Sequence, residues 1–544
     1  MSVDDVGLVA LESAGVLLIA VVAVRLSVRS GLPSLLLYLG LGLLIGERGL
    51  GLRFDDAQLT GVLGYAALVV ILAEGGLTTR WSTIKPSMLP AALLSTVGVC
   101  VSIAVTGTAA HLLLGMEWRT ALLVAAVVTS TDAAAVFSVL RRLPLPSRLV
   151  GTLEAESGFN DAPVVIAVVT LTSGVLDPAG QPSWPVLAGT AVWELAVGAA
   201  VGLAVGRFGA VGLRRVALPS SGLYPISVMG LAVFAFGAAD VLHGSGFLAV
   251  YLAALVLGNV RLPHGAAVRG FAEGLGWTAQ IGLFVLLGLL ADPARLPRSI
   301  LDGVVLGLVL LLVARPLSVL LSVSWFRIPL REQALLSWAG LRGAVPVVLA
   351  TIPLSRDVPD ATRIFDLVLV MVVALTVLQG PTLPWVARRL GLTGQVTSVD
   401  LDVESSPLGA LDADLLQVRV GPQSRLHGVE LFELRLPPRA NVTLVVRDGS
   451  AFVPDRRTAL QHGDDLIVVT AAPVREQVEQ RLREVSEGGR LAGWRTDDGL
   501  ALPGRPGSRT ALQRLAGLRP AQLGSVPLRS VAARRGSGQG RRDR

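Results

Sequence analysis

The sequence predicts an all-α polytopic membrane protein with about 13 transmembrane helices, followed by a small cytoplasmic α+β domain. Apolar residues make up 52% of the 544 residues, the mean hydropathy is +0.64, and only 16% of the residues are charged. A soluble protein has about a quarter charged residues. Many of the apolar runs approach the roughly 20 residues that a helix needs to cross a bilayer. Beyond residue 390, short strand-like runs and turn residues replace them.

Charged residues, prolines and glycines divide the apolar part of the chain into candidate spans. The chain begins with Asp4 and Asp5 and lacks the positive segment of a cleavable signal peptide, so the first run is expected to remain as a spanning helix. The candidate spans cover residues 7–27, 33–46, 59–77, 89–114, 119–139, 148–175, 184–206, 221–241, 244–259, 271–290, 297–323, 331–354 and 363–387.

Basic residues are distributed unevenly over the connecting loops. Alternate loops carry pairs or triplets of arginine or lysine with hardly any acids, and the loops between them are acidic. By the positive-inside rule, the N-terminus lies outside and the C-terminus lies in the cytoplasm of a plasma membrane. The basic loops contain Arg25 and Arg29, Arg80 and Lys85, Arg141, Arg142 and Arg148, Arg207, Arg214 and Arg215, Arg261 and Arg269, Arg327 and Arg331, and Arg388 and Arg389.

The chain is therefore expected to have three parts. Residues 1–390 form the transmembrane domain. Residues 400–484 form a small cytoplasmic domain, with strands predicted at 415–420, 442–446 and 466–470 and a charged helix at 474–485. Residues 485–544 are rich in Gly, Arg, Pro and Ser, which is typical of a disordered basic tail.

Acidic residues occur within two neighbouring spans, where an ionisable side chain is costly and its default interpretation is functional. The fifth span contains Thr131 and Asp132, and the sixth contains Glu156, Asn160 and Asp161. Glu156 and Asn160 are four residues apart and share one helical face, and Asp161 lies on the adjacent face with Ser157. These residues predict a polar site within the hydrocarbon.

Asp161 is the candidate for the group that binds the transported ions. A carboxyl group in apolar surroundings favours its neutral, protonated form, whereas its ionised form attracts a hard cation. Asp132, Ser157 and the main chain of Thr131 offer the further oxygens that hard cations require. Protons and cations then compete for one place. Because Asn160 does not titrate, we expect one proton per monovalent cation, which is an electroneutral exchange.

The second half of the chain carries two arginines within spans. Arg315 precedes a proline in the eleventh span, and Arg342 lies between two glycines in the twelfth. Each needs a carboxylate or a carbonyl partner. Glu156 is the expected partner of Arg315, and Arg342 is expected at least to cap its broken helix.

Spans 4–6 and 11–13 are expected to form an inverted repeat. In each triplet the middle helix is interrupted, once at Thr131 and Asp132 and once at Arg342 and Gly343. Four spans separate the two triplets, so they enter the membrane in opposite orientations, which is the pattern of crossed, broken helices at the midplane. An acid at one break and a base at the other would compensate opposite ends of helix dipoles.

Together these motifs resemble those of the monovalent cation:proton antiporters, and above all the NhaP-like branch related to the eukaryotic sodium/proton exchangers. The resemblance covers nearly all of residues 7–390. It rests on Thr131-Asp132, Glu156-Ser157 with Asn160-Asp161, Arg315-Pro316 and Gly340-Leu341-Arg342-Gly343.

This resemblance implies an NhaA- or NhaP-like fold, a homodimer with separate dimerisation and core regions, and elevator-like alternating access. It also implies that Asp161 binds the ion with Asp132, Thr131 and Ser157 nearby. Glu156 and Arg315 would form the structural ion pair, and Asn160 would mark electroneutral exchange.

The segment 405–484 resembles the RCK_C or TrkA-C regulatory domains of potassium transport proteins. The similar motifs are Leu434–Pro437, Val445–Gly449 and Gly463–Leu466. No GxGxxG motif follows a strand, which argues against control by NAD(H) and leaves a nucleotide or an ion as the expected regulator. The combination resembles potassium/proton antiporters, which favours K⁺ and leaves Na⁺ open.

Several other functions are disfavoured by motifs that the sequence lacks. A gated potassium channel needs a carbonyl filter such as TVGYG, and a primary pump of the P-loop type needs GxxxxGK[ST]; neither occurs. A membrane-embedded hydrolase would need two facing acids, whereas Arg315 and Asn160 suit ion binding better. The five histidines are scattered and Cys100 is the only cysteine, so neither a resident metal nor a cofactor is expected. The arginines responsible for the pI of about 10.5 serve topology rather than nucleic-acid binding.

Overall fold

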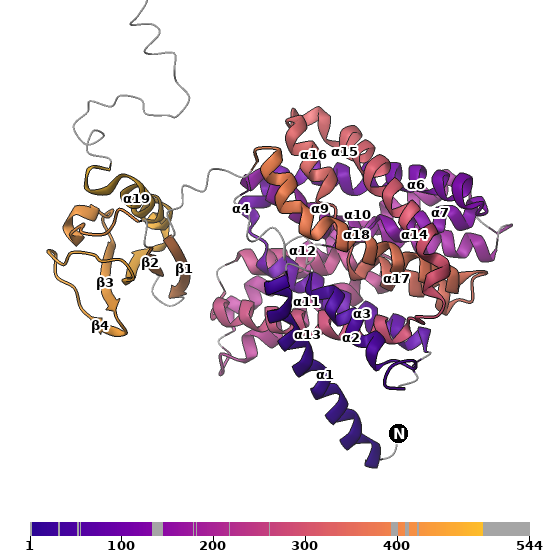
Figure 1. Ribbon diagram of the computed structural model, residues 1–544, viewed down its shortest axis with the longest axis horizontal. Helices are drawn as coiled ribbons and strands as arrows, with labels where there is room; N and C mark the ends of the chain where they lie inside the picture. The colour runs from indigo at the N-terminus through magenta and orange to yellow at the C-terminus, as the bar shows by residue number, and fades with distance from the viewer. Residues whose placement is uncertain are drawn as a thin grey trace, which may run out of the picture.

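The computed structural model contains a large helical domain and a separate small domain with one β-sheet (Figure 1). It describes residues 3–30, 33–51, 54, 56–132, 145–177, 179–180, 182–216, 218–260, 262–392, 401–408, 413–421 and 424–492. The predicted tail begins too early, because residues 485–488 continue the last helix of the small domain and Val485 is buried in its core. From position 493 onward the predicted tail lies outside the described residues, as does the end of the fifth predicted span from position 133.

Long apolar helices make up the first domain, as the sequence predicts. In the described part, eight helical stretches are long and apolar enough to cross a membrane, and five shorter apolar helices accompany them. Together they coincide one for one with the predicted spans. The helices are α1 (Val3–Ser30), α2 (Ser34–Ile45), α3 (Ala57–Thr78), α4 (Trp81–Ile84), α5 (Met88–Leu93), α6 (Val99–Leu114), α7 (Trp118–Thr129), α9 (Ser147–Leu176), α10 (Trp184–Arg215), α11 (Leu223–Val241), α12 (Gly246–Asn259), α13 (Gly265–Leu290), α14 (Leu296–Val309), α15 (Arg315–Val323), α16 (Leu330–Trp338), α17 (Ala344–Ser355) and α18 (Ala361–Arg389).

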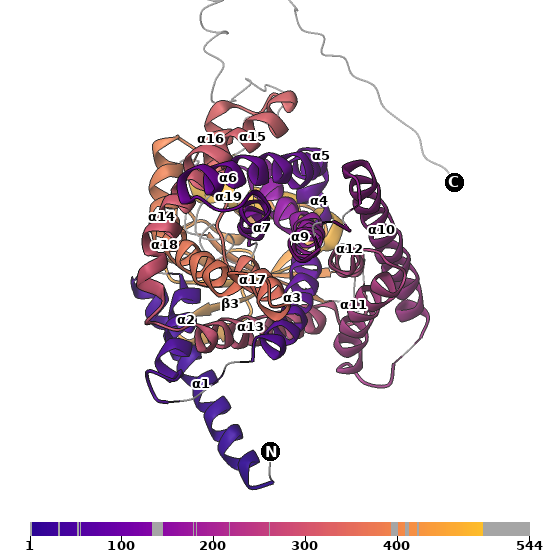
Figure 2. The same cartoon turned by 90° about the vertical axis from the view of Figure 1, so that its right-hand side faces the viewer.

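The helices of this domain pack in two groups. In one group α12 packs against α10, α11 and α3, and α13 packs against α2 and α3. In the other group α9 packs against α5 and α7, and α18 packs against α14 and α17. Helices α12 and α3 of the first group face α9 and α17 of the second, and Figure 2 shows α12 between α9 and the outlying pair α10 and α11.

Two helices of the second group contain a short π-helical segment at matching positions. Leu94–Gly98 separates α5 from α6, and Leu310–Ala314 separates α14 from α15. The first segment packs against α15 and the second against α6, so the relation is reciprocal. A π-helical turn widens a helix locally and is frequent at functional sites. This matched pair supports the predicted repeat of spans 4–6 in spans 11–13.

The small domain is an antiparallel sheet with strand order β1-β2-β5-β3-β4, and α19 (Arg475–Gly488) follows the last strand. The predicted strands correspond to β2 (Ala413–Val420), β3 (Ala440–Arg447) and β5 (Asp465–Ala471). The sequence did not predict β1 (Leu401–Leu408) and β4 (Ser450–Phe452), which are the two edge strands.

Two of the motifs that resemble TrkA-C domains meet in this sheet. The Nε and Nη2 atoms of Arg447 on β3 donate to the two carboxylate oxygens of Asp464, each at 2.8 Å. Asp464 is fully buried beside β5. In the turn from β3 to β4, Asp448 and Gly449 both have positive φ values of 50° and 78°, which is the geometry that Asp-Gly favours in a tight hairpin. The two motifs therefore stabilise the fold of the small domain.

Candidate ion-binding site

The two helix breaks predicted from the sequence lie against each other. After α7 ends at Thr129, the main chain of residues 130–132 is not helical, and residues 340–343 connect α16 to α17 in the same way. The Asp132 N–H donates to the Leu341 carbonyl at 3.0 Å. The Ala344 N–H donates to the Asp132 carboxylate at 3.1 Å. The breaks therefore cross within the second group of helices.

The contact at this crossing requires a residue without a side chain. A Cβ atom on Gly343 would lie 1.7 Å from Oδ2 of Asp132, which is far inside van der Waals contact. Gly343 therefore lets the carboxylate reach the first N–H groups of α17. These groups have no partner within their own helix and carry partial positive charge.

Arg342 makes the complementary contact at the other break. Its side chain is 1% exposed, and its Nη1 atom donates to the Thr129 carbonyl at the end of α7. A helix C-terminus carries partial negative charge, so a guanidinium stabilises it. Asp132 of the first break thus caps α17, which follows the second break. Arg342 of the second break caps α7, which precedes the first break. This is the dipole compensation that the sequence predicts.

Asp161 lies on α9 beside this crossing. Its Oδ1 atom accepts a hydrogen bond from the Ser130 hydroxyl at 2.6 Å, and the two residues are 5% and 0% exposed. Sequence reasoning did not single out Ser130. Two residues after Asp161, Pro163 has no N–H to donate to the Phe159 carbonyl, so this turn of α9 lacks one of the regular helical hydrogen bonds.

The other predicted oxygen donors form a connected set. The Asn160 amide donates to Oγ1 of Thr131 at 2.5 Å, and the same oxygen lies 3.3 Å from Oγ of Ser157. All three residues are at least 97% buried. The sequence predicted a main-chain role for Thr131, whereas these contacts involve its side chain. Oδ1 of Asn160 is buried without a hydrogen-bond partner in the described chain.

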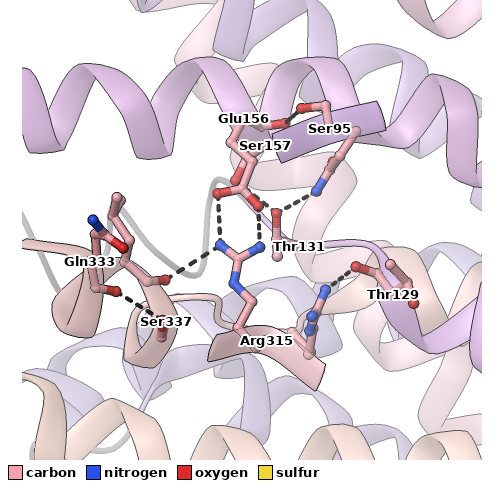
Figure 3. A network of polar contacts seen from close by, with 11 residues as sticks. Ser95, Thr129, Thr131, Glu156, Ser157, Arg315, Gln333 and Ser337 are labelled. Carbon is pink, nitrogen blue, oxygen red and sulfur yellow. Dashed lines mark hydrogen bonds and ion pairs between the residues drawn. The ribbon is translucent and has the colours of Figure 1, made fainter. Parts of the chain in front are cut away.

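Glu156 and Arg315 form the ion pair expected from the sequence. Nη1 and Nη2 of Arg315 donate to the two carboxylate oxygens of Glu156 at 2.5 and 2.7 Å, and both residues are nearly fully buried (Figure 3). Figure 3 also shows Ser95, in the first π-helical segment, at the Glu156 carbonyl, which accepts its hydroxyl at 3.1 Å. A Cβ atom on Gly340 would lie 2.8 Å from Nε of Arg315, so the second break also needs glycine here.

The buried acids of this region thus have different surroundings. Glu156 is neutralised by a guanidinium, and Asp132 binds a helix N-terminus. For Asp161, neither an arginine nor a lysine lies within ion-pair distance among the described residues. A cluster of three or more His, Cys, Asp or Glu side chains that would hold a resident metal is also absent from the described ranges. The site has the hydroxyl, amide, carbonyl and carboxylate groups that suit a transported monovalent cation.

Comparisons with known proteins show which family the chain resembles. The family model described as "Sodium/hydrogen exchanger, transmembrane" matches residues 16–389, and the TrkA-C domain model matches residues 415–504. The K(+)/H(+) antiporter NhaP of Alkalimonas amylolytica is 36% identical over 459 residues, which are 83% of this chain and 79% of that protein. The K(+)/H(+) antiporter NhaP2 of Shewanella baltica is 33% identical over 463 residues, with 83% and 79% covered.

More distant relatives extend the likeness. The Na(+)/H(+) antiporter ApNhaP of Aphanothece halophytica is 27% identical over 415 residues, which are 70% of this chain and 76% of that protein. The sodium proton antiporter MjNhaP1 of Methanocaldococcus jannaschii has the same fold, with a TM-score of 0.60 at 21% identity over 71% of this chain and 98% of that one. The extent of the family match and the identity to the antiporters fix the classification. The chain belongs to the sodium/hydrogen exchanger family and is a multi-pass cation/proton antiporter with a C-terminal TrkA-C domain.

Proposed function

We propose that this antiporter exchanges K⁺ for H⁺ and that Asp161 binds the two ions in turn. One observation carries the assignment: among the acids buried at the crossing, Asp161 has a hydroxyl partner and no cationic one in the described chain. A buried carboxylate without a counter-ion is unstable as such, so it gains free energy by binding either a proton or a metal cation. Because one carboxylate serves both ions, each displaces the other.

The remaining residues of the site have supporting roles in this proposal. Asp132, Thr131 and Ser157 provide further oxygens near the cation. The Glu156–Arg315 ion pair holds α9 against α15. Asn160 and Arg342 keep the two breaks in register through their bonds to Thr131 and Thr129.

The preference for K⁺ rests on the relatives and on the small domain. The two relatives described above at 36% and 33% identity are named as K(+)/H(+) antiporters, whereas the relative named for Na⁺ is 27% identical. A cation series tests this proposal. When K⁺ or Rb⁺ is added outside vesicles that contain the purified protein and a pH dye, the lumen should become more alkaline, with a weaker response to Na⁺ and Li⁺. A stronger response to Na⁺ would reverse the assignment, and cation flux without proton movement would favour a channel.

The exchange should be electroneutral. Only Asp161 changes its protonation state in the proposed cycle, because Asn160 beside it is an amide and Glu156 stays paired with Arg315. One K⁺ then moves against one H⁺ and no net charge crosses the membrane. We expect the rate in vesicles to stay the same when the gradient of a permeant ion that the antiporter does not carry sets the membrane potential at different values. A rate that changes with potential would show an unequal stoichiometry.

The arrangement of the whole chain follows from the same proposal. Residues 1–390 transport the ions as a homodimer, with the N-terminus outside and the C-terminus in the cytoplasm of the plasma membrane. Residues 400–484 regulate transport, and a nucleotide or an ion is the regulator that this kind of domain suits. The basic segment from residue 493 onward is suited to contact anionic lipid.

A further inference from the structure

Ser130 supplies the hydrogen bond that the Asp161 carboxylate receives in the described structure. The distance from its Oγ to Oδ1 of Asp161 is 2.6 Å, which is typical of a hydroxyl that donates to an ionised oxygen. Ser130 is fully buried, and Asp161 is 5% exposed. Water therefore competes little for this bond.

The position of the Ser130 hydroxyl is fixed from both sides. Its backbone is extended, with φ of −61° and ψ of 141°, directly after the last turn of α7. The preceding residue, Thr129, is held through its carbonyl by Arg342. Two residues further on, Asp132 is bound through its N–H to Leu341. The hydroxyl therefore keeps its distance from Asp161 while its hydrogen remains free to rotate.

The neighbouring hydroxyls are not equivalent to this one. Oγ1 of Thr131 already accepts the Asn160 amide, and Ser157 lies within 3.3 Å of the same oxygen. The Ser130 hydroxyl has Asp161 as its only side-chain partner in the described chain. It is thus the group that can change its bonding without breaking another contact.

A hydroxyl has one hydrogen and two lone pairs, so it can either donate or accept. We propose that Ser130 changes partner roles during the exchange cycle, in which Asp161 binds K⁺ and H⁺ in turn. It donates to the ionised, empty Asp161. It accepts from Asp161 when the carboxyl group is protonated, and it turns a lone pair to the cation when K⁺ is bound. Ser130 is therefore a ligand that favours cation binding over protonation, because it stabilises the carboxylate in its charged forms.

Several other charged or titratable groups lie near Asp161. Asp132 lies in the same break as Ser130, and Arg342 lies in the facing break. Glu156, which is paired with Arg315 of α15, lies five residues before Asp161 on α9. Tyr251 on α12 faces the same helix, where a Cβ atom on Gly158 would lie 2.3 Å from its ring. None of these residues is changed in the experiment below. A shift of the K⁺ dependence or of the pH profile in that experiment is therefore caused by the loss of the Ser130 hydroxyl.

This inference rests on the proposed function, and Ser130→Ala tests it in full-length protein reconstituted with a pH dye. Loss of one hydrogen bond to a charged group is expected to raise the half-saturating K⁺ concentration about tenfold. The maximal rate should change by a smaller factor than the half-saturating K⁺ concentration. The loss should be largest at acidic pH, where protons compete most strongly, so the pH profile moves to the alkaline side. Ser130→Cys keeps a side chain of similar size with a weak donor. Its half-saturating K⁺ concentration should lie between those of Ser130→Ala and the unmodified protein.

Ser87→Ala is the matched control. Its buried hydroxyl donates at 3.0 Å to the Arg148 carbonyl, about 20 Å along α9 from Asp161, so the half-saturating K⁺ concentration should not change. Unchanged K⁺ dependence and pH profile in Ser130→Ala would overturn the inference, as would total loss of exchange in a folded, monodisperse variant. Neither result would affect the assignment of Asp161, which Asp161→Asn tests separately.

Discussion

Asp161→Asn is expected to abolish cation/proton exchange while the protein still folds. Asparagine has nearly the same shape and can still accept the Ser130 hydroxyl, so the packing at the crossing should remain. An asparagine side chain binds no proton at physiological pH, and it attracts a cation less than a carboxylate does. In vesicles with a pH dye, we expect the response to K⁺ to fall to that of protein-free vesicles at every pH.

Asp302→Asn is a suitable control for this experiment. Asp302 on α14 pairs with Arg363 at 3.0 Å, and its side chain is 26% exposed, so the substitution removes a negative charge outside the site. This variant should exchange ions as the unmodified protein does. If Asp161→Asn also exchanged ions, the carboxylate at this position could not be the group that binds them.

Arg315→Ala is expected to cause the largest loss of stability. It leaves the Glu156 carboxylate buried without a partner, and removal of one member of a buried ion pair costs about 3–5 kcal/mol. That is a large part of the stability of a typical protein. We expect a lower yield of monodisperse protein and a clearly lower melting temperature in detergent, with Glu156→Ala behaving in the same way.

The double variant separates ion pairing from simple loss of packing. Replacing Glu156 with Gln and Arg315 with Met removes both charges and keeps most of the volume, so the melting temperature should recover relative to either alanine variant. If each single variant melted at the temperature of the unmodified protein, or if the double variant lost as much as the two single variants combined, the pair would not stabilise the fold in the proposed way.

Sequence alone predicted most of the candidate site because charges in hydrocarbon are too costly to be incidental. Asp161, Asp132 and Glu156 stood out for this reason, and Arg315 needed a buried acid as its partner. The crossing of the breaks followed from the interruptions at Thr131-Asp132 and at Arg342-Gly343, which lie in two triplets of opposite orientation. Each of these features involves a charged residue or a glycine within an apolar run, which can be recognised in the sequence alone.

Other features leave no such mark. Serine is frequent in membrane helices and its burial costs little when it is hydrogen-bonded, so nothing in the sequence separates Ser130 from its neighbours. The π-helical segments at Leu94–Gly98 and Leu310–Ala314 are largely apolar and lack a proline within them. The edge strand β1 contains Pro407 and no regular alternation, and β4 is three residues long, so both depend on the neighbouring strand.

The mutual capping at the crossing has a consequence for how the antiporter moves. Arg342 neutralises the end of α7 and Asp132 neutralises the start of α17, so separating the two would leave a bare guanidinium, a bare carboxylate and two uncapped helix ends away from water. Sliding one half-helix past the other is therefore unfavourable. We therefore expect both half-helices to move together during transport, as one unit relative to the surrounding helices.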